Sequence, residues 1–193
     1  DEPLAKVVHL PNPAPDVEIG ETRLILADLP ALLQVDPGTV QVFAAAAGTG
    51  AGWRSANLAL RDGINLIDLG GTAPAANMGT LLSPLPAHQS LLIDDSNQPI
   101  LRLYNESMIL PAGTGDPLSQ FAPALWINGE IVRYGFAEFM GGSDYRLRHL
   151  ARGLAGSEHK AGPHLAGTAL LLIEQQSLKL IDPRYVGSGT TIV

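Results

Sequence analysis

Apolar positions in this 193-residue chain occur in short runs, separated by glycine, proline, asparagine and aspartate, and few of them follow helical spacing. Short apolar or alternating runs bounded by turn residues are typical of β-strands. Strands are predicted at residues 23–26, 39–45, 55–60, 64–69, 90–93, 99–104, the run ending at 127, 130–139, 145–150, 168–174, 177–181 and 187–193. A helix is predicted only at 28–33, where Pro30 limits it to a turn or two. The pattern predicts an all-β protein.

The clearest local signal is Asn128-Gly129, which lies between two β-prone runs. Asn-Gly accepts the two positive φ angles of a type I′ turn, whose twist matches the strands that it joins. A β-hairpin is therefore predicted here. In its return strand, alternation places Val132, Tyr134 and Phe136 on one face, and we expect that face to contact a core.

A second hairpin is predicted beyond the turn at 141–144. Alternation in residues 145–150 places Tyr145 and His149 on one face, and Arg146, Arg148 and Leu150 on the other. The arginines are expected to point outward.

The strand pattern divides into two small sandwich-like or barrel-like units of short antiparallel strands. Residues 1–20 are expected to form an extended proline-rich leading segment that pairs only at 6–10. The first β unit is expected to cover 21–112, with a hairpin around residues 94–97. The second covers 113–193, with the boundary in the glycine-rich loop 111–117. Late in this unit, 168–174 and 177–181 are expected to form a closing strand pair.

Composition excludes several classes of function. The chain has no cysteine, so disulfides, thiolate metal sites and thiol catalysis are impossible. No run approaches the roughly 18 apolar residues of a membrane helix, and no signal-peptide pattern occurs at the start. A net charge of −7 opposes general nucleic-acid binding. We therefore expect neither nucleic acid nor membrane as a partner. Five basic residues nevertheless fall within positions 133–160 and predict a local positive stripe.

Three patterns resemble a nucleotide-binding or catalytic site but fit it poorly. The glycine-rich run 48–53 has Trp53 where a dinucleotide-binding turn needs a small residue, and no helix pattern follows. Ser188 lies in Gly-Ser-Gly, whereas a nucleophile elbow needs a glycine two residues to either side of the serine, between a strand and a helix. Asp94 and Asp95 are adjacent, so on a strand they point to opposite faces, and turn formation explains them. We expect no catalytic residue and no cofactor.

The histidines provide the one candidate metal cluster: His149, His159 and His164, with Glu158 beside the second. Their spacing matches no compact zinc motif, so we expect no metal.

Arg146, Arg148 and Arg152 are the residues expected to bind a partner protein, because guanidinium groups make paired contacts with carboxylates. An equally good interpretation for any one of them is structural: Arg152 would brace its own Gly153–Glu158 loop, while the other two are solvated.

One ordered set of residues is more specific than any of its parts. It joins the Asn-Gly hairpin and the Gly-Gly turn to a Tyr-Arg-Leu run, an Arg-Gly pair, a Gly-Ser-Glu turn and a final His and Ala-Gly. The matching residues are Asn128, Gly129, Glu130, Ile131, Ala137, Glu138, Tyr145, Arg146, Leu147, Leu150, Arg152, Gly153, Gly156, Ser157, Glu158, His164, Ala166 and Gly167. This order resembles the C-terminal region of the putative phage tail protein family, which comprises tail-tip and baseplate hub components of siphophages and gene transfer agents. A looser likeness extends over residues 22–182.

The resemblance implies a non-enzymatic structural component of a tail tip or baseplate hub. Its partners would be other tail or baseplate proteins and upstream domains of the same polypeptide, which in such relatives include a TIM-barrel-like domain. Its location would be the virion tail, after folding in the bacterial cytoplasm. Within this family Glu158 and His164 would fix loop geometry.

Two alternatives from other classes are a host-glycan-binding β module, with Trp53, Trp126 or Tyr145 stacking on sugars, and a wall hydrolase. The hydrolase requires a carboxylate pair or metal that the sequence does not offer.

Overall fold

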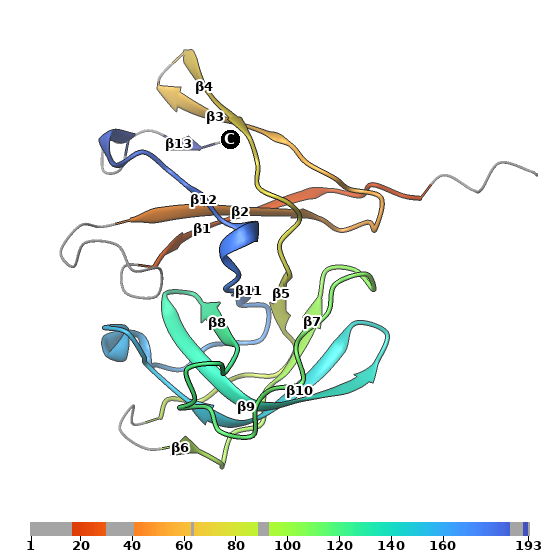
Figure 1. Ribbon diagram of the computed structural model, residues 1–193, viewed down its shortest axis with the longest axis vertical. Helices are drawn as coiled ribbons and strands as arrows, with labels where there is room; N and C mark the ends of the chain where they lie inside the picture. Colours follow the sequence, from red (N-terminus) through yellow and green to blue (C-terminus); the bar gives the residue numbers. More distant parts are fainter. Residues whose placement is uncertain (1–16, 30–40, 63, 89–92, 186–190, 193) are drawn as a thin grey trace, which may run out of the picture.

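The computed structural model describes residues 17–29, 41–62, 64–88, 93–185 and 191–192, and there the protein is almost entirely β (Figure 1). Six strands close into an antiparallel barrel in the order β10-β7-β5-β11-β8-β9, and β9 pairs with β10 again. These strands are β5 (Met78–Leu81), β7 (Ile100–Leu103), β8 (Ala124–Ile127), β9 (Glu130–Gly141), β10 (Asp144–Ala151) and β11 (Ala169–Leu172). The expected fold class is confirmed.

Two three-stranded sheets accompany the barrel. The first consists of β1 (Thr22–Asp28), β2 (Val42–Gly48) and β12 (Lys179–Leu180), and it lies between the barrel and the second sheet (Figure 1). The second contains β3 (Asn57–Asp62), β4 (Asn65–Gly71) and β13 (Thr191–Ile192). Short 3₁₀ turns occur at η1 (Glu158–Lys160), η2 (Gln175–Ser177) and η3 (Pro183–Tyr185). No helix among the described residues is long and apolar enough to cross a membrane.

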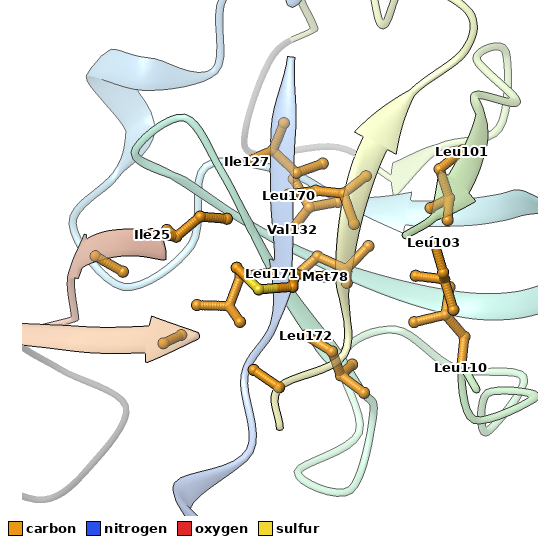
Figure 2. Packing of buried hydrophobic residues seen from close by; sticks show 14 of the residues in the cluster. Ile25, Met78, Leu101, Leu103, Leu110, Ile127, Val132, Leu170, Leu171 and Leu172 are labelled. Carbon is orange, nitrogen blue, oxygen red and sulfur yellow. The ribbon is translucent and has the colours of Figure 1, made fainter. Parts of the chain in front are cut away.

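A single large apolar cluster fills the barrel and extends to the first sheet. Figure 2 shows Leu170, Leu171 and Leu172 of β11 beside Met78 of β5, with Ile25 of β1 reaching toward them. Strand β2 is buried on both faces because its run of alanines is narrow enough to lie between two layers: Ala45 belongs to this cluster, whereas Ala44 contacts Leu58 and Ile181 in a smaller one. Apolar burial thus joins all three sheets.

The structure differs from the expected division into units at 21–112 and 113–193. Strands β5 and β7 precede residue 112, and they close the same barrel as β8 to β11. The loop 111–117 is not a linker either, because it runs beside β9: the amide of Ala137 donates to the carbonyl of Ala112 (2.8 Å), and that of Gly115 to Gly135 (2.9 Å). Its glycines permit this close approach, since a Cβ on Gly113 would come within 2.1 Å of the Gly135 carbonyl oxygen.

Two expected strand pairings are also wrong. Strand β6 (Ile93–Asp94) and β7 do not form a hairpin around residues 94–97, because both pair with β10, one after the other along the same side. Strands β11 and β12 do not pair with each other, because β11 lies between β5 and β8 while β12 joins β2. Long-range pairing outweighs sequence proximity in both cases. The expected segment 1–16, the helix at 28–33 beyond Leu29, and Ser188 lie outside the described residues.

Candidate functional site

The Asn128-Gly129 turn has the expected geometry and sets the start of β9. Asn128 has φ 47° and Gly129 φ 94°, so both central residues lie in the left-handed region of a type I′ turn. Ile127 pairs with Glu130 directly across it. This register places the first residue of the return strand, Glu130, inside the protein, where its carboxylate is fully buried.

Arg152, directly after β10, is the partner of that carboxylate. Its Nε lies 2.6 Å from Glu130 Oε1 and its Nη2 lies 2.9 Å from Oε2, a two-pronged ion pair with both side chains fully buried. The same guanidinium donates to the carbonyls of Pro86 (3.0 Å) and Gly162 (3.4 Å) and to Asp94 Oδ2 (3.3 Å). We name Asp94, Glu130, Arg152 and His164 the buried charge cluster.

This geometry corrects the expectation that Arg152 binds a partner protein. A guanidinium with no exposed surface and five acceptors from its own chain offers nothing to another molecule. Its role is to hold together segments that are distant in sequence, since its acceptors lie on residues 86, 94, 130 and 162.

Hydrogen bonds keep both buried carboxylates charged. Burial alone would raise the pKa of Glu130, but hydrogen bonds from His164 (2.6 Å to Oε2) and Arg152, with their positive charge, lower it below its ordinary value. Burial likewise opposes ionisation of Asp94, whose pKa is lowered by the side chain and backbone of Asn97, by Ser96 and by the charge of His88. The cluster is therefore compensated within the protein.

The connector after β10 completes this arrangement. Gly153 adopts φ 61° and donates its amide to Glu130 Oε1 (3.0 Å). His164 exchanges both backbone hydrogen bonds with Leu85 (2.8 Å each) while its ring binds Glu130. Glu158, in contrast, is exposed on η1, and among the described residues its carboxylate has no partner. The hydroxyl of Ser157 is the side chain that fixes the loop, accepting from the Ile131 amide (2.8 Å) and donating to the Leu154 carbonyl (2.7 Å).

Arg146 and Arg148 point outward from β10 beside exposed side chains of β9. They share one carboxylate, Glu138, at 3.5 Å and 3.9 Å, so two guanidinium groups face a single acidic group. The Arg148 guanidinium also lies over the ring of Phe136, 5.9 Å from its centroid. We name Phe136, Glu138, Arg146 and Arg148 the hairpin face. It has an excess of positive charge on a protein with a net charge of −7.

On both strands of the hairpin, the alternation of buried and exposed side chains reverses at the same level, near Gly135 and His149. On β9 Tyr134 is buried as expected, but Phe136 is 47% exposed instead of facing a core. On β10 Leu150 is buried instead of lying with the arginines. Between them His149 has φ 59°, in the left-handed region, and its ring lies against Gly135, where an added Cβ would come within 3.1 Å of it. This kink explains why simple alternation misplaces Phe136, His149 and Leu150.

The aromatic residues expected to stack on sugars are not available for stacking. Trp53 is buried and donates its indole N–H to Thr22 Oγ1 (2.9 Å), and Tyr145 is also buried. Trp126 is half-buried against the main core, with its indole nitrogen enclosed. A glycan site built on these three rings is therefore excluded.

The remaining candidate sites are also dispersed or filled. The three histidines have separate environments: His149 binds Asp95, His164 binds Glu130, and His159 is exposed on η1. Within the described ranges no three acidic or histidine side chains could hold a metal. The glycine run 48–53 lies against residues 17–20, since a Cβ on Gly50 would come within 2.2 Å of the Glu18 carbonyl oxygen, so the close approach of that segment explains the glycines.

Comparison with known proteins matches residues 76–171 to a family described as Rcc01698-like, C-terminal. The matched span begins just before β5 and ends within β11, so it covers the barrel strands, the buried charge cluster and the hairpin face. No curated protein matches the chain.

Proposed function

We propose that this protein is a structural component of the tail tip or baseplate hub of a phage, prophage or gene transfer agent, where it works through protein contacts without catalysis. The observation that carries the proposal is the hairpin face, on which Arg146 and Arg148 share the single carboxylate of Glu138. An acidic group on a neighbouring tail protein would supply the charge that this face lacks.

The residues of the tail-protein resemblance support this proposal by their positions. They fall within residues 128–167, inside the span that the family model matches. Several of them form the frame behind the hairpin face: the Asn128-Gly129 turn sets the register of β9, and Arg152 fastens the end of β10 to Glu130. A stiff frame suits a part whose task is assembly, because fewer degrees of freedom are lost on docking.

The charge pattern supports a protein partner. The chain as a whole is acidic, so similarly acidic neighbours would repel most of its surface and favour contact at a positive face. Arginine on a rigid strand, next to an exposed aromatic ring, has the composition that interfaces favour. In this function the protein resides in the virion tail, with upstream domains of the same polypeptide and other baseplate proteins as its neighbours.

The direct test is charge reversal on the hairpin face. A strain whose chain carries Arg146→Glu and Arg148→Glu should produce fewer complete particles, counted by electron microscopy, although the purified variant keeps the wild-type circular dichroism spectrum. Arg61→Glu is the control, because Arg61 is an exposed arginine on β3, which belongs to the second three-stranded sheet and not to the barrel. Normal particle numbers in the double variant would reject the interface.

Localisation is tested independently with antibody against this chain and immunogold electron microscopy of induced particles. Gold confined to one end of the tail is the expected result. Absence of label from both intact and disrupted particles would reject the virion location, whatever the charge-reversal experiment shows.

A further inference from the structure

A shallow hollow opens at one end of the hairpin face and shares Phe136 and Arg148 with it. It has a volume of about 270 Å³ and is lined by Asp95, Gln98, Phe136, Arg148 and His149. These residues come from the turn between β6 and β7 and from the two strands β9 and β10. The volume is slightly below the roughly 300–1,000 Å³ of typical small-molecule pockets, so it suits a single ring.

The kink at Gly135 and His149 creates this hollow. Normal alternation would turn His149 into the barrel with Tyr145 and Leu147, but φ 59° turns its ring outward, to within 2.5 Å of Asp95 Oδ1. The same kink turns Phe136 toward solvent, on the side where Arg148 already points outward. A non-glycine residue held in the left-handed region is strained, and such strain concentrates at functional positions.

The lining offers donors and acceptors side by side. Because a carboxylate only accepts, His149 Nδ1 must carry the proton of the Asp95 bond, which leaves Nε2 as an acceptor when the ring is neutral. Asp95 Oδ2 is a second acceptor, and the side chain of Asp95 is 69% exposed. Arg148 supplies guanidinium donors, and among the described residues no hydrogen bond occupies the exposed amide of Gln98.

We propose that this hollow binds a sugar ring that carries a carboxylate, such as a uronic acid residue of a surface polysaccharide. Arg148 would bind the carboxylate, because its nearest acidic partner, Glu138, is 3.9 Å away and is shared with Arg146. Asp95 and His149 would accept from ring hydroxyls, and Gln98 would donate to them. The exposed part of Phe136 would lie against the C–H groups of the ring.

Asp95 distinguishes a sugar from an acidic peptide. A glutamate or aspartate side chain offers only acceptors, so it could bind Arg148 but would be repelled by Asp95. A uronic acid offers its carboxylate to Arg148 and hydroxyl donors to Asp95. The inference does not rest on the tail-protein function, since it concerns a small ligand and needs no assembled particle.

The test is a titration of the purified full chain with digalacturonate, followed by amide and histidine NMR shifts. Saturable binding in the millimolar range is expected, with shifts at Asp95, Gln98 and His149. Neutral digalactose should bind at least about tenfold more weakly, because it lacks the charged group for Arg148. Arg148→Ala and Phe136→Ala should each weaken digalacturonate binding about tenfold or more. Arg61→Ala is the control, since Arg61 is exposed on β3 and does not line the hollow, and it should change binding less than twofold.

Asp95→Ala gives the sharpest readout. This variant should bind digalacturonate more weakly than the wild type does, and it should bind a tetraglutamate peptide, if at all, more strongly. No saturable digalacturonate binding at about 20 mM overturns the inference. Equal binding of tetraglutamate and digalacturonate to the wild type, or unchanged digalacturonate binding in Asp95→Ala, also overturns it. These outcomes are measured on the purified chain with Asp95→Ala and the wild type, so they can be told apart from a failure of particle assembly.

Discussion

Replacing Arg152 with methionine tests whether the buried charge cluster holds the barrel together. Methionine keeps much of the aliphatic volume of arginine but none of its donors. Glu130 would lose both guanidinium contacts and keep His164 and the Gly153 amide, while Asp94 would keep Asn97 and Ser96. Two buried carboxylates would then remain without the arginine that lies between them.

The expected cost follows from this geometry. Removing one partner of a buried ion pair destabilises a protein by about 3–5 kcal/mol, because the other charge stays buried. The carbonyls of Pro86 and Gly162 also lose their donor, which favours the upper part of that range. We therefore expect Arg152→Met to lower the free energy of unfolding by about 4 kcal/mol, a large share of the roughly 5–15 kcal/mol of a typical domain.

The double variant Arg152→Met, Glu130→Gln separates a charge effect from a packing effect. Glutamine removes the uncompensated charge, so the double variant should recover about 2 kcal/mol relative to Arg152→Met, as coupled neighbours do. Urea unfolding followed by the fluorescence of Trp53 and Trp126 measures this, since Trp126 lies in β8 of the barrel and Trp53 donates to Thr22 of β1 in the first sheet. Arg102→Met, which breaks an exposed two-pronged pair with Asp144, is the control and should have a much smaller effect.

Two results would refute the reasoning. A loss below about 1 kcal/mol in Arg152→Met would show that the cluster contributes little beyond an exposed pair. A double variant less stable than Arg152→Met would show that Glu130 is not left uncompensated when the arginine is removed.

Two further predictions concern the kink and the carboxylates. Gly135→Ala should lower the free energy of unfolding by about 1–3 kcal/mol, because its Cβ would come within 2.7 Å of the Gly115 carbonyl oxygen. Gly71→Ala is the thermal-denaturation control, because its Cβ would make only an ordinary contact, 4.0 Å from the Ala56 carbonyl oxygen; equal melting temperatures of the two variants would contradict the crowding. Because the folded pKa values of Glu130 and Asp94 are lowered, their stabilisation is complete above the ordinary value of 4.5 for Glu130 and is lost as the pH falls from there toward the folded values. Melting temperature should therefore drop between about pH 5 and pH 3, and an unchanged melting temperature over that interval would contradict the charged cluster.

Local turn chemistry made the hairpin of β8 and β9 predictable. Asn128 and Gly129 adopt the positive φ angles that their residue types favour, and the strands on either side follow. Strand pairing was harder to predict from the sequence. In the barrel β7 pairs with β10 and β5 pairs with β11, and no short-range pattern specifies such distant partners. The turn residues in 111–117 are also typical of a linker between domains, so the sequence did not show that this loop forms hydrogen bonds with β9.

The buried charge cluster had a weak signal in the sequence. Glu130 alternates in phase with Val132 and Tyr134, so the pattern that turns those two residues inward also buries a carboxylate, which needs a cationic partner. Residue type alone did not identify the arginine that provides it, although a structural role for Arg152 was one of the two interpretations that the sequence left open. The kink at His149 had no signal in alternation, and it decides which side chains of the hairpin reach solvent.

The frame and the exposed face of this protein are built from the same two strands, and this arrangement has a physical advantage. Arg152 fastens the end of β10 to the start of β9, so the outward side chains between these points lie on strands whose ends are already fixed. A partner or ligand that binds Arg148 therefore meets a backbone that has little entropy left to lose. Removing Arg152 should accordingly weaken binding at the hairpin face even though Arg152 never touches the bound molecule. If the hairpin face binds as proposed, stability and recognition are thus coupled through β9 and β10.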